Sequence, residues 1–452
     1  MDQNITPGCT LKEMEQTLWR VMQKTYAQVM EQQLLEYDEA LAAARDKNRY
    51  RLKEKRRLTL DTLFGSIEIM RNYYKDRQTG DYVYLLDQYL QCEELKGYSP
   101  MVEELAVELA VTSTSYNQAA ETLKSLLGYK VMSHETIRQH ILQLEVLAKE
   151  KQDIFGDVLF VEVDGLYIKR QDKNKRGREE KIASVHQGWE VNGKRVSLVN
   201  KRHFHHRDKK PFWESFEQFL IDTYNYDPTR HRIVINGDGA NWIKTGHEYF
   251  GRKSYYIIDR FHVARDIQRI FRDHNRCKNV KKALATYDAE ALLLELNSAV
   301  GTLGNEKKEE KLEALLKQLT AHPDGLKDYR EWLKQHNINT TQMRTMGSAE
   351  ATMSTFAKRL KHGRSWVEKG IQAMIQTMIA YKDKMDLRTI AGKLRMVTED
   401  PVKEEPVKEK AAKYYKEKLT NTAGEMTRNN LAYLKQGSGS PMFKALSALR
   451  GI

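Results

Sequence analysis

Leu159-Phe-Val-Glu-Val-Asp-Gly-Leu-Tyr-Ile168 is the stretch that decides the fold. Its β-branched and aromatic residues form a short run bounded by charge, which predicts a buried strand. Asp164 stands inside that run, and a buried carboxylate is costly unless it is paired, hydrogen-bonded or bound to a cation. Glu162 points to the same face, because side chains alternate along a strand. We interpret Asp164 as the first ligand of a divalent-metal site; the alternative for this stretch alone is a carboxylate that caps a turn into Gly165.

The sequence after this strand predicts a mixed α/β domain. Residues 181–191 and 194–203 flank the turn Asn192-Gly193, a strong hairpin signal, so three antiparallel strands are expected. Helices and further strands then alternate: a helix over 211–224, a strand over 231–236, a helix opening at Ala240 and a strand over 253–258. The order β-β-β-α-β-α-β-α is that of a ribonuclease H-like fold.

Three acidic residues stand out by their positions on these elements. Asp164 is in mid-strand, Asp238 follows a second buried strand between two glycines, and Glu350 is in the first turn of a later helix. In a ribonuclease H-like sheet the first and fourth strands are neighbours and the helix after the fifth lies across their ends, so the three carboxylates can converge. Separate carboxylates suit Mg²⁺, with Mn²⁺ as a substitute, and a pair of such ions can catalyse phosphoryl transfer.

Each of these acids also has a structural interpretation. Asp238 fits a turn before a helix, and Glu350 fits the general preference for acidic residues at helix N-termini. Gly237 and Gly239 are expected to let the backbone and a nucleic-acid phosphate approach closely.

Composition favours a polyanionic partner. The 452 residues are 40% hydrophobic and 30% charged, with a formal net charge of +13, and nucleic acid is the commonest partner of such a chain. The three cysteines stand far apart, which predicts a reducing compartment. Neither a signal peptide nor an apolar run long enough to cross a bilayer is recognisable, so we expect a cytoplasmic, nucleoid-associated protein without membrane contact. The chain has no GxxxxGK[ST] or GxSxG motif.

The N-terminal part predicts a mainly α DNA-binding region. Helical spacing over 11–58 ends in the basic run 51–57, which fits either phosphate contacts or a solvated helix face. A hairpin is expected over 62–86, with its turn at 78–80. Helices over 115–127 and 134–141, joined through Gly128 and capped by Ser133, resemble a helix-turn-helix that presents Arg138 and Gln139 to DNA; an ordinary helical hairpin is the alternative.

Two basic segments are further candidates for DNA contact. One begins beside the Asp164 strand and includes Lys169, Arg170, Lys175 and Arg176. The other, over 201–210, contains Arg202, Lys209 and three histidines whose spacing fits no usual zinc site. We interpret it as a phosphate-contacting loop, with a plain solvated loop as the alternative.

The remaining sequence predicts an all-helical insertion and a charged tail. The predicted organisation is a helical segment (1–58), a β-hairpin region (59–98), the helix-turn-helix-like region (99–150), the first part of the core (151–262), the insertion (263–346), the last core helices with Glu350 (347–395), and a charged linker and tail (396–452).

At four motifs the chain resembles a known family. Val161-Glu-Val-Asp-Gly165, Ile235-Asn-Gly-Asp-Gly-Ala-Asn-Trp-Ile243, Tyr256-Ile-Ile-Asp-Arg-Phe-His262 and Gly347-Ser-Ala-Glu350 are similar to the motifs of DDE transposases of bacterial insertion sequences, in an Lre-type group often filed as an uncharacterised family, and distantly to Mutator-type transposases. The resemblance spans roughly residues 60 to 390.

The resemblance implies a metal-binding triad of Asp164, Asp238 and Glu350. It also matches Asp259 and His262 to an Asp-x-x-His element, with His262 near DNA phosphate or the scissile bond; a structural histidine at a helix start is the alternative. The implied activity is Mg²⁺-dependent cleavage and strand transfer at element ends, by a homo-oligomer on double-stranded DNA. The rival interpretations are a structure-selective nuclease with the same triad and a catalytically idle DNA-binding protein.

Overall fold

The computed structural model describes residues 10–92, 95, 97–147, 151–171, 177–389 and 392–394. The chain divides into two compact units, one of residues 1–102 with 397–452 and one of residues 103–396. The predicted tail over 396–452 lies outside the described residues.

The first unit is a long helix packed against a two-stranded ribbon. Helix α1 (Leu11–Ala44) begins with a capping box, in which Thr10 and Glu13 satisfy each other's backbone amides. Strands β1 (Tyr50–Thr62) and β2 (Gly65–Asp76) pair in antiparallel fashion along their whole length. Leu34 of α1 packs on Leu58 and Ile69 of the ribbon in one apolar cluster. The remaining elements are β3 (Tyr82–Val83), α2 (Leu85–Tyr89) and β4 (Gly97–Tyr98).

This unit corrects two predictions. The basic run 51–57 lies on β1 and not on a helix, so the predicted boundary at 58/59 cuts a strand. Its side chains are all exposed. Because the run has no buried apolar positions, it lacks the periodicity that would distinguish a strand from a helix in the sequence. The predicted turn at 78–80 is present, since β2 and β3 pair in antiparallel fashion across it, but the return strand is reduced to the two residues of β3. A longer hairpin, with its turn at residues 63–64, joins β1 to β2.

The second unit begins with the predicted helices. Helix α3 (Pro100–Thr112) precedes α4 (Tyr116–Leu127) and α5 (His134–Gln143). Gly128 ends α4 in a left-handed conformation with φ 76°, and the Ser133 hydroxyl accepts from the amide of Thr136 to cap α5. The predicted helix pair is confirmed, but α3 crosses from one compact unit into the other, so no break falls at 98/99.

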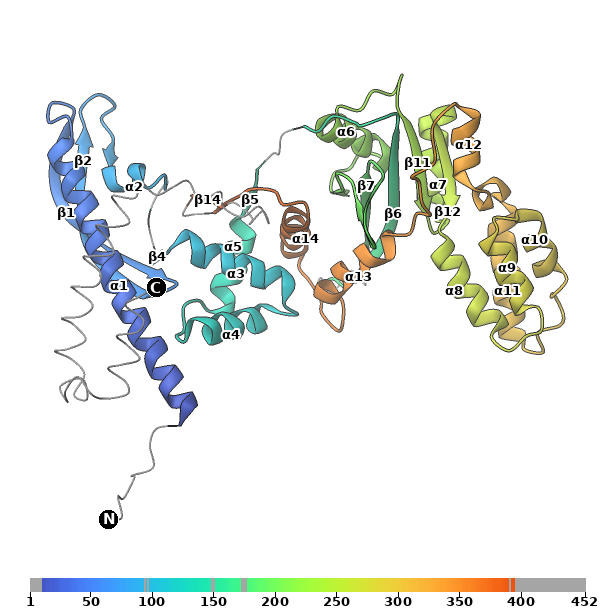
Figure 1. Ribbon diagram of the computed structural model, residues 1–452, viewed down its shortest axis with the longest axis horizontal. Helices are drawn as coiled ribbons and strands as arrows, with labels where there is room; N and C mark the ends of the chain where they lie inside the picture. Colours follow the sequence, from blue (N-terminus) through green and yellow to red (C-terminus); the bar gives the residue numbers. More distant parts are fainter. Residues whose placement is uncertain are drawn as a thin grey trace, which may run out of the picture. The chain divides into compact units, whose positions relative to one another are not determined.

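A five-stranded sheet forms the centre of the second unit (Figure 1). Its strand order is β10-β7-β6-β11-β12, with β6–β7 and β7–β10 antiparallel and β6–β11 and β11–β12 parallel. The prediction that the Asp164 and Asp238 strands are neighbours is confirmed. The bounds are β6 (Val158–Ile168), β7 (Arg178–His186), β10 (Arg202–His205), β11 (Arg232–Gly237) and β12 (Ser254–Ile258).

The predicted hairpin at Asn192-Gly193 is present but forms a separate ribbon. Among the described residues, strands β8 (Trp189–Asn192) and β9 (Arg195–Leu198) pair only with each other. Each predicted strand is therefore interrupted, and only its half distant from the turn joins the main sheet.

Alternation along the strands gives the sheet two apolar faces. Leu159, Val161 and Val163 of β6 point to the face covered by α6 (Phe212–Tyr224) and α7 (Asn241–Phe250), which is followed by the 3₁₀ turn η1 (Gly251–Lys253). Val158 and Phe160 point to the other face, where α12 (Tyr329–Gln335) packs. Glu162 and Asp164 have the same parity as Phe160, so they belong to this second face.

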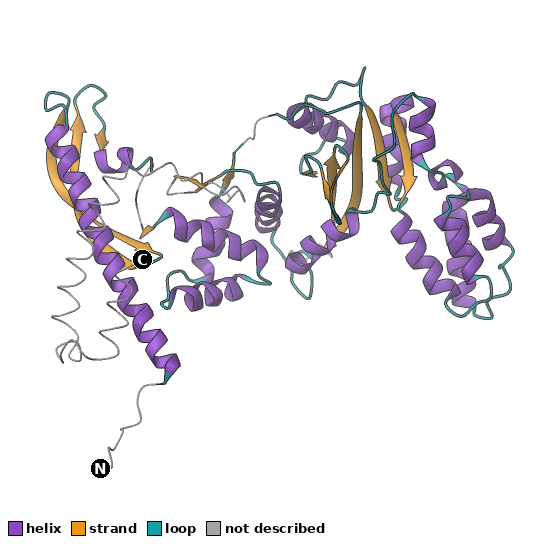
Figure 2. Ribbon diagram, in the orientation of Figure 1, coloured by secondary structure: helices purple, strands orange, loops and turns teal. Residues whose placement is uncertain are grey.

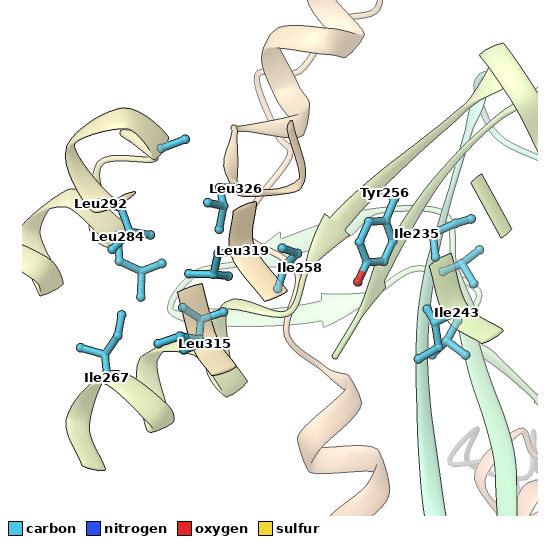
Figure 3. Close-up of a cluster of buried hydrophobic side chains, with 14 of the residues drawn as sticks. Ile235, Ile243, Tyr256, Ile258, Ile267, Leu284, Leu292, Leu315, Leu319 and Leu326 are labelled. Atoms are coloured by element: carbon cyan, nitrogen blue, oxygen red, sulfur yellow. The ribbon is translucent and has the colours of Figure 1, made fainter. Parts of the chain in front are cut away.

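The regular elements described in the predicted insertion are all helices or 3₁₀ turns, joined by loops (Figure 2). It contains the end of α8 (Arg260–Phe271) and then α9 (Cys277–Ala285), α10 (Ala289–Asn297), α11 (Glu306–Thr320), the 3₁₀ turn η2 (Pro323–Leu326) and α12. Leu315 and Leu319 of α11 share one buried cluster with Ile258 of β12 and Ile235 of β11 (Figure 3). The insertion therefore extends the core of the sheet, and the predicted boundary at 262/263 is wrong because it divides α8.

Two helices and a small sheet complete the unit. Helix α13 (Ala349–Leu360) carries Glu350 in its first turn, and α14 (Glu368–Lys382) follows, both as predicted. Strands β5 (Glu145–Val146), β13 (Leu387–Thr389) and β14 (Gly392–Leu394) form the third sheet of this unit. No helix in the described part of the chain is both long and apolar enough to cross a membrane.

We expect Arg359→Ala to lower the free energy of unfolding by about 2 to 3 kcal/mol, because it removes charged hydrogen bonds and two cation–π contacts from a buried site. Arg359 is only 3% exposed. It donates to the carbonyl of Ala110 at 2.8 Å and lies over the rings of Tyr116 and Trp366. It thereby ties the C-terminal end of α13 to the end of α3. Chemical denaturation measures the effect, and the exposed neighbour Lys358→Ala is the control. Equal, small losses for both variants would contradict this role.

Candidate metal centre

Strand register aligns three aspartates at one edge of the sheet. Val163 of β6 pairs with Gly237 of β11, and Gly237 pairs with Ile258 of β12. The next residues along these parallel strands are Asp164, Asp238 and Asp259. Asp164 in mid-strand, Asp238 in a loop and Asp259 at a helix cap are therefore neighbours, although Asp259 lies 95 positions after Asp164 in the sequence.

Each aspartate is held by its local backbone. The Asp164 carboxylate accepts from the amide of Gly165 at 2.7 Å, and that of Asp238 accepts from the amide of Ala240 at 3.0 Å. Asp259 caps α8 by accepting from the amide of Phe261 at 3.0 Å. Its own amide donates to the carbonyl of Gly237 at 2.8 Å, which joins the ends of β11 and β12.

The electrostatics of the site favour a cation. Burial raises the pKa of the Asp164 carboxyl to about 6, and the charges of Asp238 and Asp259 add to the rise, whereas the Gly165 amide and His262 oppose it. A bound cation would relieve this cost. His262 lies near these acids, and its hydrogen bond to Asp259, with 2.7 Å between Nδ1 and Oδ2, raises the pKa of the imidazole.

Glu162 anchors the N-terminus of α13 on the same face of β6. It is 2% exposed, and its carboxylate accepts from the amide of Ala349 at 2.8 Å. Burial alone would raise its pKa, but interactions with His186, Ser348 and the Ala349 amide hold the pKa below the usual range. Lys201, the residue before β10, donates to the hydroxyls of Ser348 and Thr352 at 3.0 and 2.9 Å. The first turn of α13 is thus fixed at both sides.

Glu350 lies in this anchored turn. It directly follows Ala349, whose amide binds Glu162, and Glu162 precedes Asp164 by two residues on the same face of β6. Within the described residues, however, no three His, Cys, Asp or Glu side chains are arranged closely enough to hold a metal ion. The structure therefore brings Asp164 and Asp238 together and fixes the helix that carries Glu350, without assembling the complete triad.

We expect Glu162→Gln to destabilise the protein by about 1 to 2 kcal/mol, because a charged hydrogen bond at a helix N-terminus becomes a neutral one. Thermal unfolding measures the loss, and the exposed Glu313→Gln on α11 is the control. No difference between the two would show that the carboxylate does not anchor α13.

The sequence indicated Glu162 only as a neighbour of Asp164 on the same face of the strand. Their spacing of two residues was the available signal.

The glycines beside Asp238 serve internal packing. A Cβ atom at Gly237 would lie 2.6 Å from the Ile243 side chain of α7. Gly239 has φ 94° and lies against Gln318 of α11, whose side chain donates to the Asp238 carbonyl at 2.7 Å. Close approach of the side chains of α7 and α11 is therefore sufficient to account for both glycines in this structure.

Arg170 corrects a predicted DNA contact. Its side chain is buried, forms an ion pair with Glu180, and lies 3.3 Å from Glu368 of α14. A guanidinium held in this way is committed to the protein interior and is not available to DNA. Lys169 is exposed, as a DNA contact requires, whereas Lys175 and Arg176 lie outside the described residues.

The second basic segment is partly a strand. Over 202–205 it forms β10, so the prediction of a loop is wrong there. His203 pairs with Asp383 at 2.5 Å, and His205 pairs with Glu180 at 2.7 Å, both buried. Alternation turns these histidines inward. Arg202 is partly buried and donates to the carbonyl of Lys201 at 3.0 Å, and Lys209 is exposed beyond the strand.

Arg138 and Gln139 lie on α5 as predicted. Both donate to Glu135 one turn earlier, with distances of 2.7 to 2.8 Å. The Arg138 hydrogen bonds are the main cause of a Glu135 pKa lowered to about 2. A phosphate contact by Arg138 would have to replace this pairing.

Comparison with known proteins identifies the family. Residues 4–396 match the family described as Uncharacterised protein family (UPF0236). The chain belongs to this family.

The relatives of this UPF0236 protein carry the same family name. One from Caldanaerobacter subterraneus subsp. tengcongensis is 26% identical over 411 residues, which cover 88% of this chain and 83% of the relative. Another, named for the vanSb 3′ region of Streptococcus gallolyticus, is 28% identical over 412 residues, covering 85% of this chain and 88% of the relative. A third, also from Caldanaerobacter, is 27% identical over 408 residues, covering 88% and 82%, and its single name covers eleven loci.

Chemically, the UPF0236 site offers hard oxygen donors beside a protonatable histidine. Asp164 and Asp238 present carboxylate oxygens, the ligand type that Mg²⁺ prefers. The Nδ1 atom of His262 is engaged by Asp259, which leaves Nε2 as the nitrogen that an incoming group would meet.

Proposed function

We propose that this UPF0236 protein is a transposase of a bacterial insertion sequence, which binds the element ends and catalyses metal-dependent DNA strand cleavage and strand transfer. The observation that carries the proposal is the pairing of β6 with β11, which sets Asp164 beside Asp238 at the ends of neighbouring parallel strands. The strand order β10-β7-β6-β11-β12 supports a ribonuclease H-like core, because it joins the first and fourth strands of the domain.

The donor set fits Mg²⁺ or Mn²⁺. Asp164 and Asp238 would hold the ions, and Glu350 would complete the site from the first turn of α13. When bound, two divalent ions supply Lewis acidity at both the attacking and the leaving oxygen of a phosphodiester. The pKa of the Asp164 carboxyl is raised by its burial near other carboxylates. This cost of ionisation is the feature of the chain that fits a cation at the site.

The chain's own residues have distinct roles in this proposal. Asp164 and Asp238 orient their oxygens through the amides of Gly165 and Ala240. Glu162 is a positioning residue, since it fixes the helix that carries Glu350. His262, kept protonatable by Asp259, contributes positive charge where a DNA phosphate would lie.

Gene multiplicity among relatives supports mobility. A single protein name that covers eleven loci in the Caldanaerobacter relative is what repeated copies of a mobile gene would leave. The net charge of +13 supports a polyanionic partner, with double-stranded DNA as the proposed one and assembly of several copies on it.

The test is an assay of wild-type protein with labelled DNA that contains the ends flanking its gene, a second target duplex, and Mg²⁺ or Mn²⁺. The proposal expects nicks at the element ends and covalent joining of the 3′-hydroxyl to the target. Cleavage without joining would favour a structure-selective nuclease. DNA binding without metal-dependent cleavage would favour a DNA-binding protein on an idle scaffold, and either result would reject the transposase assignment.

A further inference from the structure

The ribbon of β1 and β2 carries a cluster of exposed, positively charged side chains. Residues 49–57 contain six Lys or Arg residues and one acidic residue, Glu54. All side chains from 51 to 57 are exposed. Exposure of seven consecutive residues on a strand is unusual, because one face of a strand normally packs on a core.

Half of these cations already have partners and half do not. Arg49 pairs with Asp76 at 2.9 Å, Arg56 with Glu54 at 2.6 Å, and Arg57 with Glu68. Arg51, Lys53 and Lys55 have no acidic partner within 4.0 Å among the described residues. Lys75 on the neighbouring strand β2 is exposed as well. These charges remain available to an anionic ligand.

An aromatic group lies under the cationic end of the ribbon. The rings of Tyr73 and Tyr82 stack with 5.3 Å between centroids, and Tyr84 lies 4.8 Å from Tyr73. Lys53 and Lys75 approach the Tyr82 ring at 6.0 and 5.9 Å. The stacked rings stiffen the ribbon and hold both ammonium groups on the same side of it.

The ribbon is also narrow, because β3 extends it only at Tyr74 and Lys75 of β2, and it has an open edge. Within the described residues, β1 pairs with β4 only at Leu60 and Asp61, so from Tyr50 to Thr59 its outer edge has no strand partner. A two-stranded antiparallel ribbon fits the major groove of B-form DNA, which is about 12 Å wide. The major groove of A-form RNA is too narrow to admit it.

We infer that the β1–β2 ribbon is an arm that binds duplex DNA, with the ribbon in the major groove and Arg51, Lys53 and Lys55 against the flanking phosphates. Charge complementarity favours DNA over a protein partner. The ribbon carries three unpaired cations and the exposed Lys75, and its one acidic residue in this segment, Glu54, is already paired with Arg56. The inference does not depend on the strand-cleavage proposal, because it concerns a different compact unit and requires binding only.

The test measures DNA affinity by fluorescence anisotropy with the full-length chain. The variant Arg51→Gln/Lys53→Gln/Lys55→Gln is compared with Lys307→Gln/Lys311→Gln/Lys317→Gln, which removes the same charge from exposed positions of α11. Probes are a labelled DNA duplex and an RNA duplex of the same sequence, over a series of salt concentrations. We expect the ribbon variant to bind DNA at least about tenfold more weakly, and the salt slope of log K to fall by about 3, since each phosphate contact contributes about 0.9. The α11 variant should stay within about threefold of wild type.

Three results would overturn the inference. Equal losses in both variants would mean that only total charge matters. Tighter binding of the RNA duplex than of the DNA duplex would exclude a major-groove arm. Unchanged DNA affinity with new self-association of the ribbon variant would mean that the charges only protect an open strand edge. Circular dichroism of both variants establishes that the ribbon unit is folded, and loss of DNA binding with intact structure is the supporting result.

Discussion

Asp164→Asn is expected to reduce metal-dependent strand cleavage by about a thousandfold or more, equivalent to about 4 kcal/mol of transition-state stabilisation. Asparagine has nearly the shape of aspartate, but its neutral amide is a poor ligand for a hard cation. Asp238→Asn is expected to have the same effect, because the register of β6 and β11 makes the two acids one site. The rate of nicking of an element-end duplex in Mg²⁺ is the measurement.

The same variants separate function from folding. The Asp164 pKa of about 6 lies above the ordinary aspartate value, so ionisation of this carboxyl at neutral pH costs the folded protein more free energy than the unfolded chain. Removing that charge should therefore leave the melting temperature of the metal-free protein unchanged or raise it, while activity is lost. The exposed Asp273→Asn is the matched control and should keep full activity. A catalytically normal Asp164→Asn protein would end the assignment of this acid.

Asp87→Ala is expected to destabilise the first unit by about 3 to 5 kcal/mol, since it leaves a buried guanidinium without its counter-charge. The side chains of Arg71 on β2 and Asp87 on α2 are 5% and 4% exposed and form an ion pair. Asp87 also accepts from the amide of Leu95 at 3.1 Å, and Arg71 donates to the Leu95 carbonyl at 3.1 Å. The Arg71 guanidinium lies 3.6 Å from the centroid of Tyr84.

Urea denaturation, monitored through tyrosine fluorescence, measures this loss of stability. The double variant Arg71→Met/Asp87→Leu should lose less stability than Asp87→Ala, because neither charge then remains buried. Asp81→Ala, in the exposed turn before β3, is the control. If the single variant is as stable as the control, the pair does not hold α2 to the ribbon. A destabilised ribbon should also bind DNA less well, which connects this pair to the proposed DNA arm.

Local patterns predicted those elements whose apolar residues repeat with a clear period. The helix pair joined by Gly128 and the anchored helix with Glu350 have buried positions at helical spacing, and the strand around Asp164 is a continuous buried run of β-branched and aromatic residues. The β1 strand was missed because residues 51–57 are exposed on both faces, and charge alternation does not distinguish a strand from a helix face.

Side-chain partners that are distant in sequence could not be predicted from local patterns. Arg170 was predicted to contact DNA, but it is buried between Glu180 of the neighbouring strand and the distant Glu368 of α14. His203 is buried by Asp383, which lies 180 residues away. The adjacency of Asp164 and Asp238 was predictable, because strand order alone determines it; the orientation of Glu350 depends on how α13 rests on Glu162, which no local pattern contains.

The central claim is that Asp164, Asp238 and Glu350 share divalent cations. Titration of the metal-free protein with Mn²⁺, followed by electron paramagnetic resonance of the free ion, tests it most directly. The account predicts that wild type binds Mn²⁺ and that Asp164→Asn, Asp238→Asn and Glu350→Gln each weaken binding by about tenfold or more, while Glu313→Gln does not. Wild-type affinity in the Glu350→Gln protein, or Mn²⁺ binding that survives loss of both aspartates, would contradict it.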